Sequence, residues 1–463
     1  MIAFLFVFDY RINMQNTSTK NIMGYEPIPK LIMKISLPLM ISMLVQALYN
    51  VVDSIFVAMV SETALTAVSL AFPLQNLLIA FAVGTAVGVN SFLARKLGEG
   101  NQAIAEETAG NGIFLAFATW LVFTLIGLFG VKPFLSLYTD DPELLRQSIT
   151  YSRIVLLCSL GIFIDITCER IMQATGDSFH PMIIQIAGAV TNIILDPIFI
   201  FIFDMGVAGA AVATVLGQIV GMVLALYYVR KNKHINVKIR EIRPRVNVIK
   251  NIYAVGAPTI VTNAISTVMV SMMNSILIAF SATAVSIFGV YFKLQSFVFM
   301  PIFGLNAGMV AIIAYNYGAG DKDRMLKTLK VGTIIAVSIM VAGFIAFQLF
   351  PAQLLALFSA SDNMLEIGIP ALRTISLHFI IAGFSIALMS IYQAVGFGVA
   401  SMVISISRQL LVLIPSAWLL GSLFGLNAVW YSFLIAEIAS ILISIGFYSM
   451  VYKKDIKNLK KIN

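Results

Sequence analysis

Long apolar stretches recur along the whole chain and are separated by short polar segments. Each stretch runs for roughly 20 residues or more, enough to cross a hydrocarbon core of about 30 Å as an α-helix. The pattern predicts an all-α integral membrane protein with twelve membrane-spanning helices. The expected spans are 34–60, 68–94, 111–131, 147–172, 179–203, 206–230, 251–280, 284–313, 330–350, 367–392, 398–421 and 425–452.

The two halves of this pattern are copies of each other. Pro38 and Pro258 are separated by 220 residues, and the same offset pairs "QATG" at 173–176 with "QAVG" at 393–396. One ungapped offset that aligns landmarks over most of both halves indicates a tandem duplication. Each copy holds six spans, an even number, so both copies have the same orientation. We therefore expect two six-helix bundles related by a pseudo-two-fold axis along the membrane normal.

The composition, 59% hydrophobic and 11% charged, supports the membrane class. The net charge of +8 suggests a nucleic-acid partner, but the basic residues collect in the segments on one side of the predicted membrane. This asymmetry predicts a multi-pass protein of the cell (inner) membrane with both termini in the cytoplasm, and no nucleic-acid partner. The domains that we expect are a cytoplasmic segment 1–33, an N-lobe 34–230, a basic linker 231–250, a C-lobe 251–452 and a basic tail 453–463.

The first residues, "MIAFLFVF", have no basic region before them and no small-residue cleavage site after them. A signal peptide is therefore not expected. Initiation at Met14 or Met23 fits the sequence equally well.

Several polar residues inside the spans were not kept by the duplication. The offset pairs Asp53 with Met273, and Asp196 with Ser416. The same holds for three more polar residues of the first half, which pair with smaller or apolar ones: Gln46 with Ser266, Asn50 with Val270, and Asn192 with Val412. The N-lobe therefore carries a charged site that the C-lobe lacks.

Counting along the helices places the two aspartates at one depth. Asp53 and Asp196 each lie 17 residues from the inner end of an outward-running span, about 25 Å from the cytoplasmic face. The spacing puts Gln46, Asn50 and Asp53 on one face of the first helix. Two further residues are expected near the same layer: Asn192, one turn before Asp196, and Thr214 on the sixth helix.

A lone charged carboxylate at that depth costs several kcal/mol. Two neighbouring carboxylates repel each other, so at least one should bind a proton or attract a cation. Oxygen ligands from Asp, Asn and Thr suit Na⁺, and the residues do not choose between H⁺ and Na⁺. The structural alternatives are that Asp196 before Pro197 caps a restarted helix, and that Asp53 only hydrogen-bonds its neighbours.

The fourth helix adds Asp165 and Glu169, one turn apart, with Arg170 beside them. They form either an interfacial ion pair or a proton route from the cytoplasm. Tyr151, at the outer end of that helix, either bonds toward the Asp196 layer or belongs to an interfacial aromatic belt. In the C-lobe, Lys293, Arg408 and His378 lie in expected spans that contain one deep acid, Glu437. The sequence leaves three roles open for them: pairing with this acid, lining a pore, and snorkelling to the membrane surface.

The sequence resembles the multidrug and toxic compound extrusion (MATE) family, twelve-helix secondary antiporters built from two six-helix bundles. The resemblance covers roughly 30–452 and is carried by "LPLMISMLVQALYNVVDSIFVA", "GDSFHPMIIQIAGAVTNIILDPIFIF" and "MGVAGAAVATVLGQ". It is to prokaryotic members with a carboxylate site in the N-lobe. It implies a cation or proton site at Asp53, Asn192, Asp196 and Thr214, with Gln46 and Tyr151 nearby.

The resemblance further implies export of amphipathic, often cationic, drugs or metabolites in exchange for H⁺ or Na⁺. We expect no enzymatic activity, no cofactor besides the coupling ion, and a monomer in the lipid bilayer. One alternative is a lipid-linked oligosaccharide flippase of the same broad superfamily, for which Lys293 and Arg408 are the candidate cavity cations. Another is an intramembrane aspartyl protease, which also needs two membrane aspartates; the Gly-x-Gly-Asp sequence at 318–321 lies in the turn after an expected span, not inside one.

Overall fold

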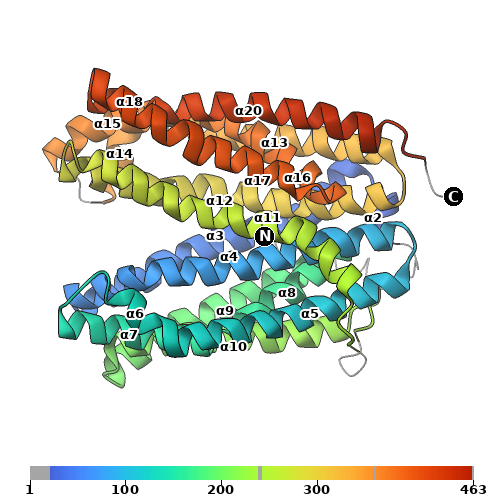
Figure 1. The fold of residues 1–463 in the computed structure, drawn as a ribbon, viewed down its shortest axis with the longest axis horizontal. Helices are drawn as coiled ribbons and strands as arrows, with labels where there is room; N and C mark the ends of the chain where they lie inside the picture. Colours follow the sequence, from blue (N-terminus) through green and yellow to red (C-terminus); the bar gives the residue numbers. More distant parts are fainter. Residues whose placement is uncertain (1–20, 238–241, 359–360, 461–463) are drawn as a thin grey trace, which may run out of the picture.

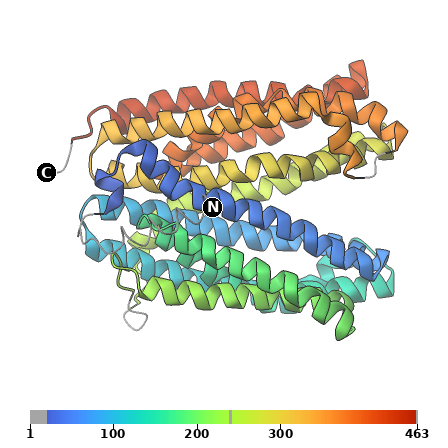
Figure 2. The ribbon, with the colours of Figure 1, turned by 180° about the vertical axis from the view of Figure 1, so that it is seen from behind.

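The computed structural model of the chain describes residues 21–237, 242–358 and 361–460, and these contain helices and no strand. Figures 1 and 2 show two stacked bundles of long helices. We call α3 to α10 the N-lobe and α11 to α20 the C-lobe. The expectation about the first 20 residues lies outside the described part.

The N-terminal half is built from α2 (Ile22–Tyr25), α3 (Ile28–Val60), α4 (Glu62–Gly98), α5 (Gln102–Leu125), η1 (Ile126–Gly130), α6 (Val131–Leu135), α7 (Pro142–Leu157), α8 (Leu160–Ala174), α9 (Phe179–Pro197), η2 (Ile198–Ile202) and α10 (Gly206–Arg230). The C-terminal half is built from α11 (Val246–Leu277), α12 (Ala282–Gly318), α13 (Lys322–Leu349), α14 (Pro351–Ala356), α15 (Asp362–Ser376), α16 (Phe379–Val395), α17 (Gly398–Ile406), η4 (Ser407–Leu413), α18 (Ile414–Phe424), α19 (Leu426–Val429), α20 (Ser432–Val451) and η5 (Tyr452–Ile456).

Among the described residues, ten helical segments are long and apolar enough to cross a membrane, and the bent pair α15 and α16 forms an eleventh. The remaining expected span, 147–172, is formed by α7 and α8. Together these segments make the twelve-helix, two-bundle arrangement that the hydrophobic pattern predicts.

Two spans expected as continuous helices, 147–172 and 367–392, are broken. The first is interrupted at Cys158 and Ser159, and the second bends by 43° between α15 and α16. A break frees backbone carbonyls, which need partners inside a membrane. At the first break the indole Nε1 of Trp120 donates to the carbonyl oxygen of Leu157 at 2.9 Å. The hydropathy of these spans is continuous, so the sequence pattern alone did not reveal the breaks.

Helix ends repeat at the offset of the duplication. α4 runs from residue 62 to 98 and α12 from 282 to 318, so both ends differ by 220. The turn after each helix contains a glycine with positive φ, 73° at Gly100 and 71° at Gly320. Only glycine adopts this conformation without strain, so the duplicated glycines preserve the same turn in both lobes.

The lobes meet through α3 with α12 and α4 with α11. Glycines of the Gly-x-x-x-Gly motifs make this close approach possible. A Cβ atom on Gly88 would lie 2.1 Å from the carbonyl oxygen of Ile252, and one on Gly304 would lie 2.7 Å from the backbone of Leu39. The guanidinium of Arg95 also donates from α4 to the carbonyl of Val395 at 3.2 Å.

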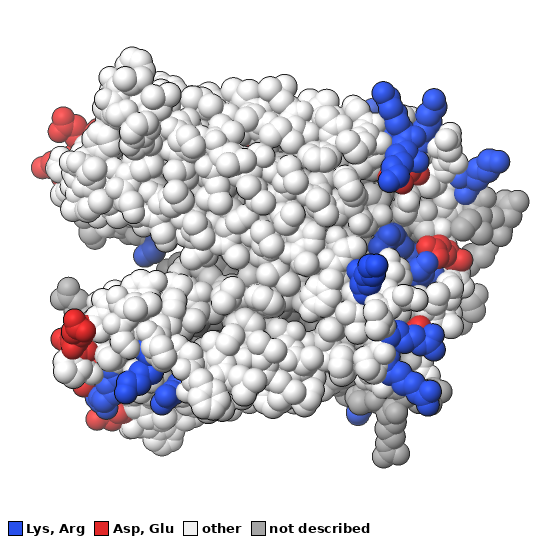
Figure 3. All heavy atoms as spheres, in the orientation of Figure 1, with Lys and Arg blue, Asp and Glu red and all other residues white. Residues whose placement is uncertain are grey.

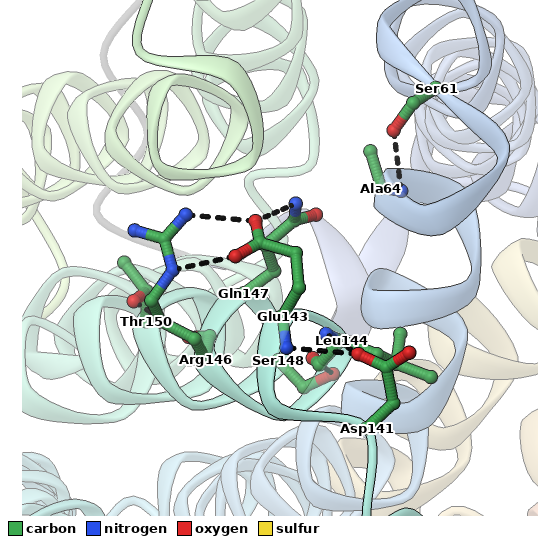
Figure 4. Close-up of polar contacts among 9 residues, drawn as sticks. All are labelled: Ser61, Ala64, Asp141, Glu143, Leu144, Arg146, Gln147, Ser148 and Thr150. Atoms are coloured by element: carbon green, nitrogen blue, oxygen red, sulfur yellow. Dashed lines mark hydrogen bonds and ion pairs between the residues drawn. The ribbon is translucent and has the colours of Figure 1, made fainter.

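Charge is distributed unevenly along the long axis of the molecule. Figure 3 shows a large group of Lys and Arg side chains at one end, which we call the basic end, and a smaller group together with acidic side chains and a hollow between the lobes at the opposite end. Arg146 lies at the opposite end, where its Nη2 and Nε donate to the carboxylate of Glu143 at 2.8 and 3.0 Å (Figure 4). The charge of Arg146 is therefore neutralised locally by Glu143.

Candidate functional site

Three of the expected site residues are buried together where α9 packs against α10. The amide nitrogen of Asn192 lies 3.3 Å from Oδ1 of Asp196 and 3.4 Å from Oγ1 of Thr214. In the reversed amide orientation Asn192 donates to Oδ2 of Asp196 at 3.1 Å and accepts from the backbone N–H of Thr214 at 3.2 Å. Either orientation connects the two helices through this asparagine. Asp196 is fully buried within α9, so it does not cap a new helix before Pro197.

Asp53 brings a second carboxyl group to this position from α3. Its side chain lies within hydrogen-bonding reach of the Asp196 carboxyl, and its Oδ1 is buried without a partner in the described chain. Two carboxylates share a hydrogen bond only if one carries a proton, and otherwise a cation must separate them. Tyr151 is buried close to both acids, and its hydroxyl accepts from Nε2 of Gln75 at 3.0 Å.

The face of α3 that carries Asp53 differs from the expected one. Gln46 and Tyr49 line the cavity described below, and Tyr49 lies close to both aspartates. Asn50, which we expected on the same face, is exposed. The half-buried positions follow the spacing 46, 49, 53, and the exposed Asn50 lies one residue, about 100°, round the helix from Tyr49. Tyr49 was not among the expected residues, although its i, i+3, i+7 spacing with Gln46 and Asp53 places it on their face of the helix.

A cavity of about 130 Å³ extends from this cluster into the half of the N-lobe nearer the basic end. Polar side chains from α3, α8, α9 and α10 line it, from Asn192 and Thr214 to Asp165 and Glu169. The cavity therefore runs from Asn192 and Thr214, beside the two aspartates, to the acids of α8.

The acids of α8 are not an interfacial ion pair. Glu169 and Arg170 are 4% and 8% exposed, so both are buried. Nη1 of Arg170 donates to Oε1 of Gln173 at 2.9 Å. Among the described residues, no ion pair within 4.0 Å joins Arg170 to Asp165 or Glu169. Their burial in the cavity wall does not fit an interfacial pair, and the proton route from the cytoplasm stays a prediction.

The charged residues of the C-lobe are arranged differently. Nη1 of Arg408 lies 3.2 Å from Oε2 of Glu437, whose side chain is 3% exposed. The ammonium of Lys293 lies 5.8 Å from the ring centroid of Phe358. Of the options left open for these residues, Arg408 is therefore paired with the deep acid, and its charge is neutralised.

The sequence matches the MatE family twice, over residues 38–198 and 258–419, and both limits of the first match recur about 220 residues later. The chain is 27% identical over 411 residues to the multidrug export protein MepA of Staphylococcus haemolyticus, covering 88% of this chain and 90% of that protein. It is 26% identical over 413 residues to MepA of Staphylococcus aureus strain RF122, covering 89% and 91%.

Solved structures of related transporters also match the whole fold of this chain. A crystal structure of MATE in complex with MaL6 superposes with a TM-score of 0.91 at 26% identity, covering 96% of this chain and all of that one. An outward-facing conformation of a multidrug resistance MATE family transporter gives the same TM-score, identity and coverage. A MOP superfamily transporter from Pyrococcus furiosus gives a TM-score of 0.90 at 26% identity, covering 97% of this chain and all of that one.

The family matches cover both lobes, and the relatives and structures agree along nearly the whole chain. These matches exclude the intramembrane protease and an enzymatic role. This chain belongs to the MATE family of multidrug efflux transporters.

Proposed function

We propose that this protein exports amphipathic, often cationic, organic compounds in exchange for H⁺ or Na⁺, by alternating access. The observation that carries this proposal is the contact between the carboxyls of Asp53 on α3 and Asp196 on α9, with Asn192 and Thr214 completing the cluster. The names of the MepA relatives support multidrug export.

The coupling follows from electrostatics in a medium of low dielectric constant. With a proton or Na⁺ bound, Asp53 and Asp196 attract each other through the shared ion and hold α3 against α9. When the ion leaves, repulsion between the carboxylates favours a different packing of these helices. An ion that binds the two packings unequally shifts the population between them, and this links its gradient to substrate movement.

The orientation of the protein in the membrane is inferred from the distribution of its Lys and Arg residues. We take the basic end as cytoplasmic, by the positive-inside rule, in a cell membrane with both termini inside. The hollow in Figure 3 then opens outward, and the contacts of α4 with α11 and of α3 with α12 close the inner side. We retain the domain limits 34–230 and 251–452 for the two rocking bodies, with 1–33, 231–250 and 453–463 as cytoplasmic segments of a monomer.

A flippase for lipid-linked oligosaccharides fits less well. A pyrophosphate head group requires several free cations in the central cavity. Of the two candidates, Arg408 is bound to Glu437, which leaves Lys293. The drug or metabolite exporter is therefore the function that the geometry favours.

The test is efflux of a fluorescent organic cation from cells or proteoliposomes with imposed H⁺ or Na⁺ gradients. Asp53→Asn and Asp196→Asn each keep the volume and polarity of the site but remove one charge. We expect each to lower gradient-driven efflux by about 5- to 150-fold, the range of typical coupling free energies. The gradient that drives the unmutated protein identifies the ion. Unchanged efflux by both variants under every gradient would refute the coupling site.

A further inference from the structure

The inner part of the N-lobe cavity presents acceptor oxygens that have no partner in the described chain. They are Oδ1 of Asp165, Oε1 of Glu169, Oε1 of Gln185 and Oε1 of Gln218. All four side chains line the same cavity, and they come from three helices, α8, α9 and α10. An unpartnered buried oxygen costs about 1–3 kcal/mol, and more when it is charged, so a set of four in one cavity requires an explanation.

The charge of this region favours a monovalent cation. Asp165 and Glu169 contribute two carboxylates, and the neighbouring cation, Arg170, spends one of its donors on Gln173. One guanidinium leaves a net charge of about −1 on the group when both acids are ionised. A single positive charge in the cavity neutralises this net negative charge. An uncompensated charge inside the membrane is costly in free energy.

The ligand types and the available volume narrow the class of cation further. Two carboxylates and two amide oxygens are hard ligands, which suit Na⁺. The cavity of about 130 Å³ is smaller than the roughly 300–1,000 Å³ of pockets that hold drug-sized ligands, so the transported compound does not fit. It has room for an ion with a few waters.

The local backbone is built to admit these side chains. A Cβ atom on Gly221 of α10 would lie 2.5 Å from Oδ2 of Asp165, and one on Gly161 of α8 would lie 3.2 Å from Cβ of Gln218. Each glycine therefore lets a polar residue of the facing helix come against its backbone. Alanine at Gly221 would displace the carboxylate without removing any oxygen.

The duplicated positions in the C-lobe lack this chemistry. The residues 220 positions after Asp165, Glu169, Gln185 and Gln218 are Ser385, Met389, Ser405 and Ile438. No carboxylate or amide occurs among these four, so the feature belongs to the N-lobe alone.

We propose that Asp165, Glu169, Gln185 and Gln218 form an inner Na⁺ site, distinct from the Asp53–Asp196 pair and joined by the cavity to the neighbouring Asn192 and Thr214. This inference rests on the proposed antiport, because it gives the exchanged ion a second binding site, between the carboxyl groups of Asp53 and Asp196 and the basic end. Na⁺ at this site supplies the four unpartnered oxygens with a shared partner.

The test is binding of ²²Na⁺ to the purified full-length protein in detergent, with K⁺ and choline as competitors. The double variant Asp53→Asn/Asp196→Asn removes the charges of the outer cluster. We expect it to retain saturable ²²Na⁺ binding that choline does not displace. Adding Glu169→Gln to this background should weaken the remaining binding by at least about 10- to 100-fold, the loss that follows even from removing an outer-shell partner of a metal site.

Gly221→Ala in the same background provides a second variant that keeps every ligand, and it should weaken binding as well. Arg408→Met/Glu437→Leu, which removes both charges of the C-lobe pair together, is the matched control and should leave ²²Na⁺ binding unchanged. Absence of ²²Na⁺ binding in the outer double variant, or unchanged binding after Glu169→Gln, would overturn the inner site. The antiport proposal fails separately, by unchanged efflux in the outer variants.

Discussion

The interiors of the two lobes occupy equivalent positions of the duplication but neutralise charge in different ways. In the N-lobe, Gly188 of α9 lies against Gly217 of α10, and a Cβ on Gly217 would be 2.8 Å from the Gly188 carbonyl oxygen. The residues 220 positions later are Arg408 and Glu437, which form the 3.2 Å ion pair of the C-lobe. The same helix crossing is thus closed by two glycines in one lobe and bridged by opposite charges in the other.

This difference shows how one fold supports two roles. The C-lobe has an acid and a base that neutralise each other, so it needs no external ion at this crossing. The N-lobe has Asp53, Asp196, Asp165 and Glu169, and the described residues show no ion pair within 4.0 Å for any of them. Acids without an internal ion pair must be protonated or be neutralised by other cations, and this supports the proposal that the N-lobe binds the coupling ion.

The largest expected effect concerns the C-lobe pair. Arg408→Met leaves Glu437 buried without its partner and should lower the free energy of unfolding by about 3–5 kcal/mol. The measurement is unfolding in detergent followed by circular dichroism. The double variant Arg408→Met/Glu437→Leu removes both charges and should regain most of the loss. Equal destabilisation by the single and the double variant would show that the pair does not neutralise itself.

The glycine crossing of the N-lobe gives the next largest effect. Gly217→Ala places a Cβ too close to the Gly188 carbonyl and 3.3 Å from Cβ of Asn192, so α9 and α10 must separate. We expect a loss of about 1–3 kcal/mol in the same unfolding assay, with weaker coupling of efflux to the ion gradient. Gly446→Ala, where no atom lies within 4 Å of the added Cβ, is the control and should cause no loss of stability, since alanine favours a helix more than glycine does. A neutral Gly217→Ala would contradict the close crossing.

A smaller effect is expected at the broken span of the N-lobe. Trp120→Phe keeps an aromatic ring but removes the donor to the Leu157 carbonyl. The free energy of unfolding should fall by about 0.5–1.5 kcal/mol, the net worth of one hydrogen bond. Hydrogen exchange of the α7–α8 segment should rise in the variant. If exchange in this segment does not change, the indole does not stabilise the break.

The smallest effect separates two neighbours on α3. Asn50 is exposed, so Asn50→Ala should change stability by no more than about 0.5 kcal/mol and leave ion-driven efflux unchanged. Tyr49→Phe, beside the aspartate cluster, should lower efflux at a given gradient. If Asn50→Ala lowers efflux more than Tyr49→Phe does, Asn50 and not Tyr49 contributes to ion coupling.

Much of the fold and part of the site were predictable from the sequence because both follow local or periodic rules. Apolar length predicted the spans, and the constant offset predicted the duplication and its two bundles. The failure of the offset at Asp53, Asn192 and Asp196 singled out residues that the structure brings together with Thr214. The sequence did not distinguish Asn50 from Tyr49, because the spacing 46, 50, 53 is as regular on a helix as the spacing 46, 49, 53. The facing helices decide which of these two stripes is buried.

The sequence by itself determined which segments cross the membrane, how often the bundle is repeated and which lobe carries acids that the other lacks. These properties depend on the free energy of burying each segment in lipid, and that is a sum over neighbouring residues. Only the tertiary structure decided that Arg408 neutralises Glu437, that Asp165 and Glu169 line a cavity, and that two spans break. Those outcomes depend on the distances between side chains of different helices, and a sum over residues that are neighbours in the sequence carries no information about these distances.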